Sequence, residues 1–195
     1  QIAKALMGVE IEQNLLFDVT LHAATVLSTI VVLWSEVARL LRGLFSRRFN
    51  EEQAYVLKLL LSMIPIGIVG FTLKDRLDAL LESPAILLVV GCMLLVTAAL
   101  LAFAYYAKPR QKAQLSYRDA FLIGVAQAVA ALPGLSRSGS TIATGLLLGN
   151  RKQTVAQFSF LMVLAPILGE TFLELMKGNL GAQAIGSAPL AAGFV

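Results

Sequence analysis

Residues 133–141 read Pro-Gly-Leu-Ser-Arg-Ser-Gly-Ser-Thr and hold the groups that bind a phosphate. The string combines one guanidinium with three serine hydroxyls, one threonine hydroxyl and two glycines. A guanidinium forms paired, charge-assisted hydrogen bonds with phosphate oxygens, and glycines let backbone N–H groups converge on an anion. The string therefore predicts a phosphate-binding loop in which Arg137 meets the charge.

The stretches on either side of this loop are apolar but short. Residues 120–132 are 13 uncharged, mostly apolar positions, and residues 141–149 add nine more. Each is about half of the roughly 20 residues that a spanning helix needs. We therefore expect residues 120–149 to form a re-entrant helix-loop-helix hairpin. A loop at membrane depth has to be buried in protein or line a wet cavity, and its arginine needs an anionic partner or water.

Composition indicates the class of protein independently of this motif. The chain of 195 residues is 57% hydrophobic and only 14% charged, with a mean hydropathy of +0.77. These values exclude a soluble globular domain and predict an integral membrane protein of the helical kind. The net charge of +4 is spread over short loops, which favours a role in membrane orientation over nucleic-acid binding. The single cysteine, Cys92, lies in an apolar run and is predicted to have a packing role only.

Four further stretches are long enough to span a bilayer, at 17–34, 55–73, 85–106 and 155–176. With the hairpin they predict an all-α, polytopic membrane protein made of a single membrane domain, 1–195. If the hairpin returns to its side of entry, ten basic residues lie on one side and four on the other. The larger group marks the cytoplasmic side. It consists of Arg39, Arg42, Arg47, Arg48, Lys108, Arg110, Lys112, Arg118, Arg151 and Lys152, against Lys4, Lys74, Arg76 and Lys177.

The two ends of the chain suggest a fragment. It begins at Gln1 without a methionine and stops inside an apolar stretch, 188–195. Three full spans precede the hairpin, so a second hairpin before residue 1 would enter from the opposite face. We therefore expect this chain to contain half of an inverted-topology repeat, whose two halves would meet near the membrane midplane.

The string 133–141 resembles the P-G-x-S-R-S-x-x-T signature of the undecaprenyl-diphosphate phosphatases, the bacitracin-resistance (BacA-type) membrane enzymes; we call it the signature segment. Its flanks at 117–127 and 158–161, and the segment 17–22, are also similar to that family. The resemblance covers nearly the whole chain. The family's glutamate-rich E/Q-x-x-x-E motif, its proposed nucleophilic serine and its histidine would precede Gln1, and later helices would follow the last residue.

The resemblance implies a membrane hydrolase that converts undecaprenyl diphosphate to undecaprenyl phosphate and phosphate, and so recycles the lipid carrier for cell-wall synthesis. It implies the bacterial inner membrane, with a site that opens to the periplasmic or extracellular face. We expect Arg137 to be the catalytic cation, and a short helix starting near Thr141 to aim its N-terminus at the anion. The expected substrate-binding residues are Ser136, Ser138, Thr141, Gly134, Gly139 and Gln127.

A divalent cation, magnesium or calcium, is also implied, with carboxylate ligands outside this chain and no metal ligand within it. The expected partners are the polyprenyl diphosphate and membrane lipids, with no nucleic acid and with a homodimer left open. We expect the isolated 195-residue chain to be inactive.

Several of these residues also have simpler explanations. The signature segment could be an ordinary surface turn between two short helices. His22 could pack inside a span or line the site, and Asp18 could cap a helix. Glu170, deeper in its span than Glu174, is expected to be structural, either protonated or paired with a neighbouring helix.

A second functional class stays open. A transporter or lipid flippase would also use a broken hairpin to bind an anionic substrate near the midplane, and it too would need Arg137. A nucleophile and acidic residues upstream of Gln1 would favour hydrolysis, whereas a second passive anion loop there would favour transport.

Overall fold

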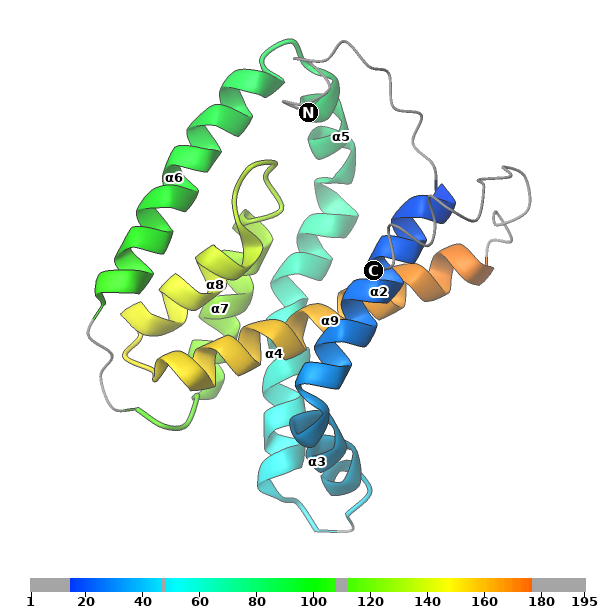
Figure 1. Cartoon of the computed structure of the whole chain (residues 1–195), viewed down its shortest axis with the longest axis vertical. Helices are drawn as coiled ribbons and strands as arrows, with labels where there is room; N and C mark the ends of the chain where they lie inside the picture. Colours follow the sequence, from blue (N-terminus) through cyan, green and yellow to red (C-terminus); the bar gives the residue numbers. More distant parts are fainter. Residues whose placement is uncertain (1–14, 47, 108–111, 177–195) are drawn as a thin grey trace. The chain divides into compact units, whose positions relative to one another are not determined.

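The computed structural model describes residues 15–46, 48–107 and 112–176 (Figure 1). This described part of the chain is helical and contains no named strand, which confirms the all-α prediction. The helices are α2 (Leu15–Val32), α3 (Trp34–Leu44), α4 (Glu51–Thr72), α5 (Lys74–Glu82), α6 (Ile86–Tyr106), α7 (Tyr117–Val129), α8 (Arg137–Leu147) and α9 (Lys152–Met176).

The chain forms two compact units. Residues 40–162 make up one unit, which contains α4 to α8 and the first part of α9. The described residues 15–39 and 163–176 belong to the other. The signature segment and its surroundings all lie within the first unit.

Helices α4 and α6 are each long and apolar enough to cross a membrane. A third candidate arises if residues Ala24–Val32 and Trp34–Leu44 are counted as one span, although these two pieces are bent by 84°. The protein is therefore a multi-pass membrane protein. Each predicted span, 17–34, 55–73, 85–106 and 155–176, coincides largely with one helix, and their membrane crossing as four spans stays a prediction.

The segment after the first predicted span differs from expectation. Residues 35–54 lie between two predicted spans, and no helix was predicted there, but α3 and the first turn of α4 occupy most of the segment. Glu36 and Arg39 form an i,i+3 ion pair of 2.7 Å on α3. Asn50 then starts α4, because its side-chain oxygen accepts a hydrogen bond of 2.8 Å from the N–H of Gln53.

Helices α4 and α7 pack closely, and a glycine allows it. A Cβ added at Gly124 would lie 2.2 Å from the carbonyl oxygen of Ser62 on α4, so no larger residue fits this crossing. Beside it, Tyr55 and Phe158 meet edge to face at 5.7 Å between ring centroids. The buried core around them contains Leu115, Ala120, Ile123, Phe158 and Met162.

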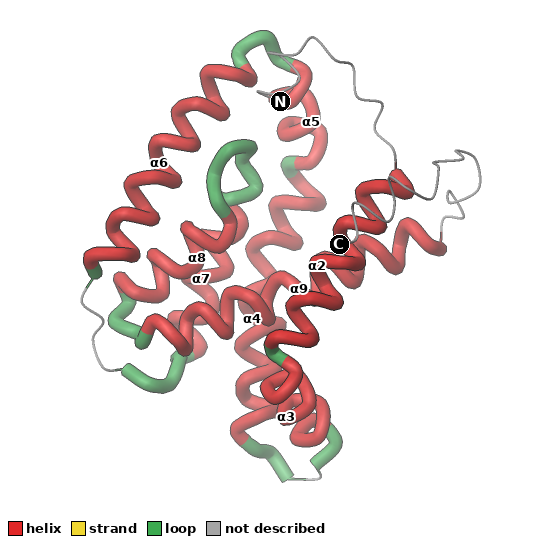
Figure 2. The backbone as a smooth tube through the Cα atoms, in the orientation of Figure 1, coloured by secondary structure: helices red, strands yellow, loops and turns green. Residues whose placement is uncertain are grey.

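Helices α7 and α8, with the connecting residues 130–136, form a helix-loop-helix that we call the hairpin (Figure 2). Its two ends meet: the N–H of Arg151 donates to the carbonyl of Lys112 at 3.1 Å, and the hydroxyl of Thr154 donates to the carbonyl of Ala113 at 3.2 Å. The chain therefore leaves the hairpin where it entered. Whether the hairpin is re-entrant in a membrane stays a prediction.

The second helix of the hairpin begins earlier than expected. We expected it to start near Thr141, but α8 starts at Arg137, with Ser136 as its N-cap. The hydroxyl of Ser136 accepts a hydrogen bond of 3.1 Å from the N–H of Gly139, which satisfies one of the free donors of the first turn. The second half of the signature segment is therefore helical, and Arg137 is its first helical residue.

Candidate phosphate-binding site

The signature segment turns sharply at Gly134. This residue has φ of +90°, a backbone conformation that favours glycine. A Cβ at this position would also lie 2.8 Å from the carbonyl oxygen of Val90 on α6. Glycine thus permits both the turn and the close approach of the loop to α6.

The hydroxyl of Thr97 on α6 holds this turn from both sides. It donates to the carbonyl of Gly134 at 3.0 Å and accepts from the N–H of Ser136 at 2.9 Å. Sequence reasoning missed Thr97. One signal could have found it, because it is the one hydroxyl in the otherwise uncharged and mostly aliphatic residues 86–104.

Three contacts fix how far the hairpin extends along α6. Thr97 lies 11 residues after Ile86 and nine before Tyr106, so the turn sits near the middle of this helix. At the other end, the ammonium of Lys152 donates to the carbonyl of Tyr105 at 3.2 Å. The hairpin therefore runs from the C-terminal end of α6 to its middle and back, as Figure 1 shows beside α6.

Positive charge is concentrated where the turn becomes a helix. The Arg137 side chain is exposed, and no carboxylate of the described residues lies within ion-pair distance of it. The N–H groups of Arg137 and Ser138 stand in the first turn of α8, without a hydrogen-bond acceptor in the part of the chain that the structure describes. A guanidinium and free amides at a helix N-terminus form an arrangement that attracts an anion.

Two serine hydroxyls flank Arg137 in the sequence. The Oγ atoms of Ser136 and Ser138 are 3.4 Å apart, and the Ser138 side chain is exposed. Gly139 leaves room for the capping hydroxyl, because a Cβ there would lie 3.1 Å from the Oγ of Ser136. The structure thus brings Gly134, Ser136, Arg137, Ser138 and Gly139 together over the turn and the first turn of α8.

Two predicted site residues are buried. Thr141 is fully buried, with its hydroxyl donating to the carbonyl of Arg137 at 2.9 Å and lying 2.6 Å from the hydroxyl of Ser159 on α9. Gln127 on α7 is 1% exposed, and neither atom of its amide group has a hydrogen-bond partner among the described residues. An unpaired buried polar group costs about 1–3 kcal/mol, so the position is not explained by packing.

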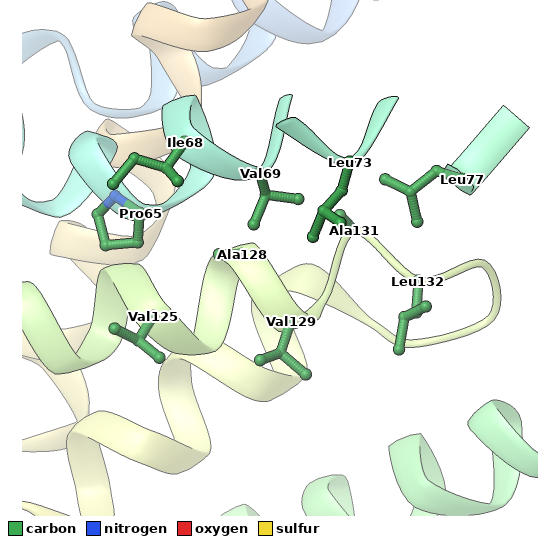
Figure 3. Close-up of a pocket in the computed structure, with 10 residues that line it drawn as sticks. All are labelled: Pro65, Ile68, Val69, Leu73, Leu77, Val125, Ala128, Val129, Ala131 and Leu132. Atoms are coloured by element: carbon green, nitrogen blue, oxygen red, sulfur yellow. The ribbon is translucent and has the colours of Figure 1, made fainter. Parts of the chain in front are cut away.

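An apolar groove of about 470 Å³ adjoins the start of the signature segment. Helices α4 and α7 run side by side along it, and Leu132 stands on the adjoining loop, one residue before Pro133 (Figure 3). Its lining residues are all apolar: Pro65, Ile68, Val69, Leu73, Leu77, Val125, Ala128, Val129, Ala131 and Leu132.

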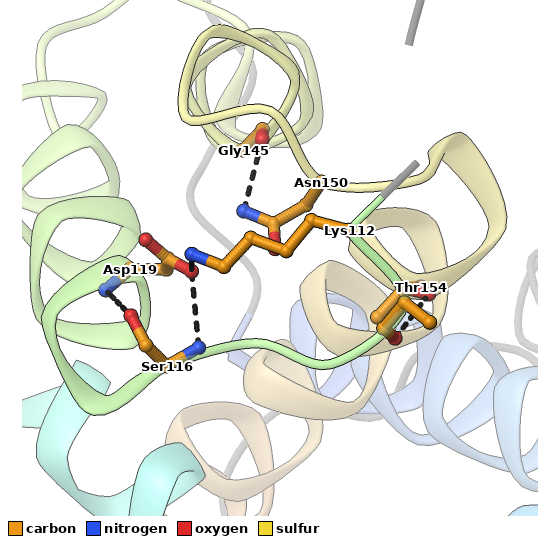
Figure 4. Close-up of polar contacts among 7 residues, drawn as sticks. Lys112, Ser116, Asp119, Gly145, Asn150 and Thr154 are labelled. Carbon is orange, nitrogen blue, oxygen red and sulfur yellow. Dashed lines mark hydrogen bonds and ion pairs between the residues drawn. The ribbon is translucent and has the colours of Figure 1, made fainter. Parts of the chain in front are cut away.

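The base of the hairpin is held by a buried carboxylate (Figure 4). Asp119 pairs with the ammonium of Lys112 and accepts from the N–H of Ser116 at 3.0 Å, while the Ser116 hydroxyl accepts from the N–H of Asp119 at 3.1 Å. This is a capping box at the start of α7. Burial raises the pKa of Asp119, but the hydrogen bonds from Lys112 and Ser116 outweigh burial and leave the pKa below its ordinary value.

The described residues do not fit a metal centre. No three His, Cys, Asp or Glu side chains gather in the described part of the chain, and the exposed cation at the turn would repel a metal ion. The side chains of Asp18, His22 and Glu170 lie outside the described part, so their predicted roles stay predictions.

Comparison with known proteins decides the family. The model of the family described as bacitracin resistance protein BacA matches residues 1–195. The chain belongs to the BacA family. This confirms the resemblance that the signature segment carried.

Relatives in the BacA family are similar along the whole chain. A protein from Parabacteroides distasonis named undecaprenyl-diphosphatase is 59% identical over 197 residues, which cover 100% of this chain and 73% of that protein. A Bacteroides fragilis protein of the same name is 58% identical over the same shares. One from Christiangramia forsetii is 47% identical, covering 100% of this chain and 74% of that protein.

Proposed function

We propose that this protein is a membrane phosphatase that hydrolyses undecaprenyl diphosphate to undecaprenyl phosphate and inorganic phosphate. The observation that carries the proposal is the exposed guanidinium of Arg137, which no described carboxylate neutralises and which stands at the N-terminus of α8 in a BacA-family signature segment. The relatives named undecaprenyl-diphosphatase supply the substrate class.

The reaction adds water across a phosphoanhydride. A new oxygen bonds to the terminal phosphorus, the bond from that phosphorus to the bridging oxygen breaks, and the lipid leaves with one phosphate. Charge spreads over the equatorial oxygens in the transition state, so positioning and electrostatic stabilisation dominate catalysis. Arg137 would grip two of these oxygens, which a planar guanidinium does better than an ammonium.

The neighbouring groups would bind the same anion. Ser136 and Ser138 offer hydroxyls. The first-turn N–H groups of Arg137 and Ser138 form the N-terminus of α8, the positive end of the helix dipole, and would donate to the anion. Thr141 is committed to the carbonyl of Arg137 and to Ser159, so we assign it to holding the first turn of α8. The buried, unpaired amide of Gln127 is retained as a polar group of the site.

The depth of the turn supports a substrate that stays in the membrane. The hairpin base lies at the end of α6 and its turn lies at the middle of that helix, so a bilayer spanned by α6 would hold the turn about halfway across. Basic residues at the hairpin base, including Lys112 and Lys152, favour the cytoplasmic side of the bacterial inner membrane for that end. The site would then open toward the periplasmic or extracellular face.

The apolar groove would receive the first isoprene units of the lipid tail. It begins one residue before Pro133, and its volume of about 470 Å³ falls within the roughly 300–1,000 Å³ of small-molecule sites. A diphosphate on the turn could thus keep its tail on an apolar wall.

A divalent cation, magnesium or calcium, belongs to the proposal through the family resemblance alone. Its carboxylate ligands would come from residues other than the described ones, and none of the steps above is derived through it.

Phosphate release from undecaprenyl diphosphate by the full-length protein tests this function, with Arg137→Ala as the variant. Arg118→Ala is the matched control, because Arg118 is an exposed arginine at the base of the same hairpin. We expect kcat/KM to fall about 100-fold or more for Arg137→Ala, the effect of losing a main charge-stabilising donor, and to stay near wild type for Arg118→Ala. Movement of the lipid across vesicles without phosphate release would support the transporter instead.

A further inference from the structure

One threonine hydroxyl of α6 is used entirely outside its own helix. Thr97 donates to Gly134 at 3.0 Å and accepts from Ser136 at 2.9 Å, and these two residues flank Leu135 in the turn. Both hydrogen bonds join positions more than 35 residues apart in the sequence. The hydroxyl therefore satisfies one carbonyl and one N–H that the turn leaves without helical partners.

Two threonines of the apolar helices α2 and α4 behave differently. Thr29 on α2 donates to the carbonyl of Thr25 at 2.8 Å, and Thr72 on α4 donates to the carbonyl of Ile68 at 2.7 Å. Bonding back to the carbonyl four residues earlier is the usual arrangement for threonine in an apolar helix. Thr97 departs from it, and the departure coincides with the signature segment.

Other residues on the same side of α6 as Thr97 also lie close to the turn and to α8. A Cβ at Gly134 would meet Val90 at 2.8 Å and Met93 at 3.2 Å, and one at Gly139 would meet Leu101 at 3.6 Å. Val90, Met93, Thr97 and Leu101 are spaced by three or four residues and share one side of the helix. The apolar members set the distance between α6 and the turn, and Thr97 alone supplies polar contacts that fix its orientation.

We propose that Thr97 is a positioning residue of the site, whose hydroxyl orients the turn so that α8 presents Arg137 and the first-turn amides to the substrate. The N–H that it holds belongs to Ser136, the N-cap, and the Ser136 hydroxyl in turn holds the N–H of Gly139. Loss of the Thr97 hydroxyl would free the Gly134 carbonyl and the Ser136 N–H in apolar surroundings. The N-terminus of α8 would then shift, whereas Thr97 itself touches no substrate.

The test uses Thr97→Val, which keeps the shape and removes the hydroxyl, and Thr97→Ser, which keeps the hydroxyl. Thr72→Val is the matched control, because it removes a hydroxyl that bonds only its own helix. Two readouts are needed in the full-length protein: amide hydrogen exchange over residues 134–139, and kcat and KM for phosphate release. The melting temperature of each variant is measured beside them.

For Thr97→Val we expect faster exchange at Ser136 and a kcat lower by about 100-fold, the effect of a misplacement of about 1 Å in a site. KM should stay within about threefold, since binding of the lipid in the ground state depends less on this orientation. Thr97→Ser should restore both readouts. The melting temperature should fall no more than for Thr72→Val.

Three results would overturn the proposal: Thr97→Val matching Thr72→Val in exchange and kcat, Thr97→Ser being as impaired as Thr97→Val, or a loss of activity that merely follows a fall in melting temperature. The kinetic readout rests on the proposed phosphatase function, but the exchange readout does not. If the wild-type protein released no phosphate, the proposed function would fail, and exchange at Ser136 would still decide the role of Thr97.

Discussion

The hydroxyl oxygens of Thr141 and Ser159 lie 2.6 Å apart, with both side chains almost fully buried between α8 and α9. Thr141 also donates to the carbonyl of Arg137, so a single contact chain runs from α9 through Thr141 to the residue expected to bind phosphate. Thr141, which the sequence predicted to be a substrate ligand, thus contacts the backbone of Arg137, and its role as a ligand stays a prediction.

This contact predicts a larger effect of one substitution than of the other. Thr141→Val removes the partner of the Ser159 hydroxyl and the hydrogen bond to the carbonyl of Arg137, so it should lower the free energy of unfolding by about 1–3 kcal/mol. Ser159→Ala leaves the Thr141 hydroxyl its bond to that carbonyl, so its loss should be smaller, about 0.5–1.5 kcal/mol. The double variant should be less destabilised than the sum, since the contact between the two hydroxyls is lost only once. If Thr141 contacted the substrate directly, Thr141→Val would lose far more phosphate release than Ser159→Ala in the same preparations.

Gln127 should show a trade-off between stability and activity. Replacing its unpaired buried amide with the similarly shaped methionine removes a desolvated polar group, so we expect Gln127→Met to raise the melting temperature. We also expect phosphate release to fall at least tenfold if Gln127 is a polar group of the site, as proposed. A variant with full activity would remove Gln127 from the site, whatever its stability.

Gly134→Ala should impair the protein through the backbone. The added Cβ meets a positive φ and the carbonyl of Val90, so the turn has to move away from α6, and we expect a loss of about 1–3 kcal/mol in stability together with most of the activity. Gly91→Ala is the control, because a Cβ at Gly91 has nothing within 4 Å and alanine is the better helix former. That variant should be as active as wild type and at least as stable.

Asp119 should make the hairpin base sensitive to acid. Its pKa in the folded protein lies below the ordinary value of 3.8, so its stabilising contribution is complete above about pH 4 and is lost as the pH falls through the lowered folded value. Asp119→Ala should lower stability by about 0.5–2 kcal/mol near neutral pH and flatten the acid limb of the melting temperature against pH.

Glu36→Gln provides the comparison for Asp119, because its ion pair with Arg39 is more exposed and worth at most about 1 kcal/mol. Its melting curve should keep the wild-type acid limb. An unchanged acid limb in Asp119→Ala would show that the capping box does not carry the pH dependence.

The groove should matter for the lipid tail and not for the phosphate. Val129→Asn places an amide on its wall, so we expect KM for undecaprenyl diphosphate to rise several-fold while inhibition by inorganic phosphate stays unchanged. Leu95→Asn is the control, an exposed apolar residue of α6 that does not line the groove. Equal KM values for the two variants would show that the lipid tail does not bind in this groove.

The long helices were predictable because apolar length alone marks them. The stretch expected at 85–106 is α6, Ile86–Tyr106, since Pro84 precedes it and no charge interrupts it. The amphipathic α3 was missed, because its charges exclude it from the long apolar stretches and its Glu36–Arg39 pair becomes visible only on a helix. The sequence pattern predicts a helix less reliably where the helix depends on pairs of charged side chains than where it is a long apolar stretch.

The site was predictable in its residue types but not in its geometry. Glycines, serines and Arg137 stood in one string, so their proximity at the turn followed from the chain itself. The start of α8 at Arg137 depended on whether Ser136 or a later residue would cap it, which the string alone leaves open among three serines and a threonine. Thr97 and Ser159 are tertiary partners, and no spacing in the sequence connects them to the turn.

Neither α7, with 13 residues, nor α8, with 11, is long enough to be integrated into a bilayer by itself. The turn between them needs Thr97 to occupy its polar backbone groups, and α7 needs the close approach of α4 at Gly124. Both α4 and α6 emerge from the ribosome before the hairpin does. The order of the elements along the chain is therefore also an order of assembly. The two long helices are made first, and they provide the surfaces on which the hairpin packs.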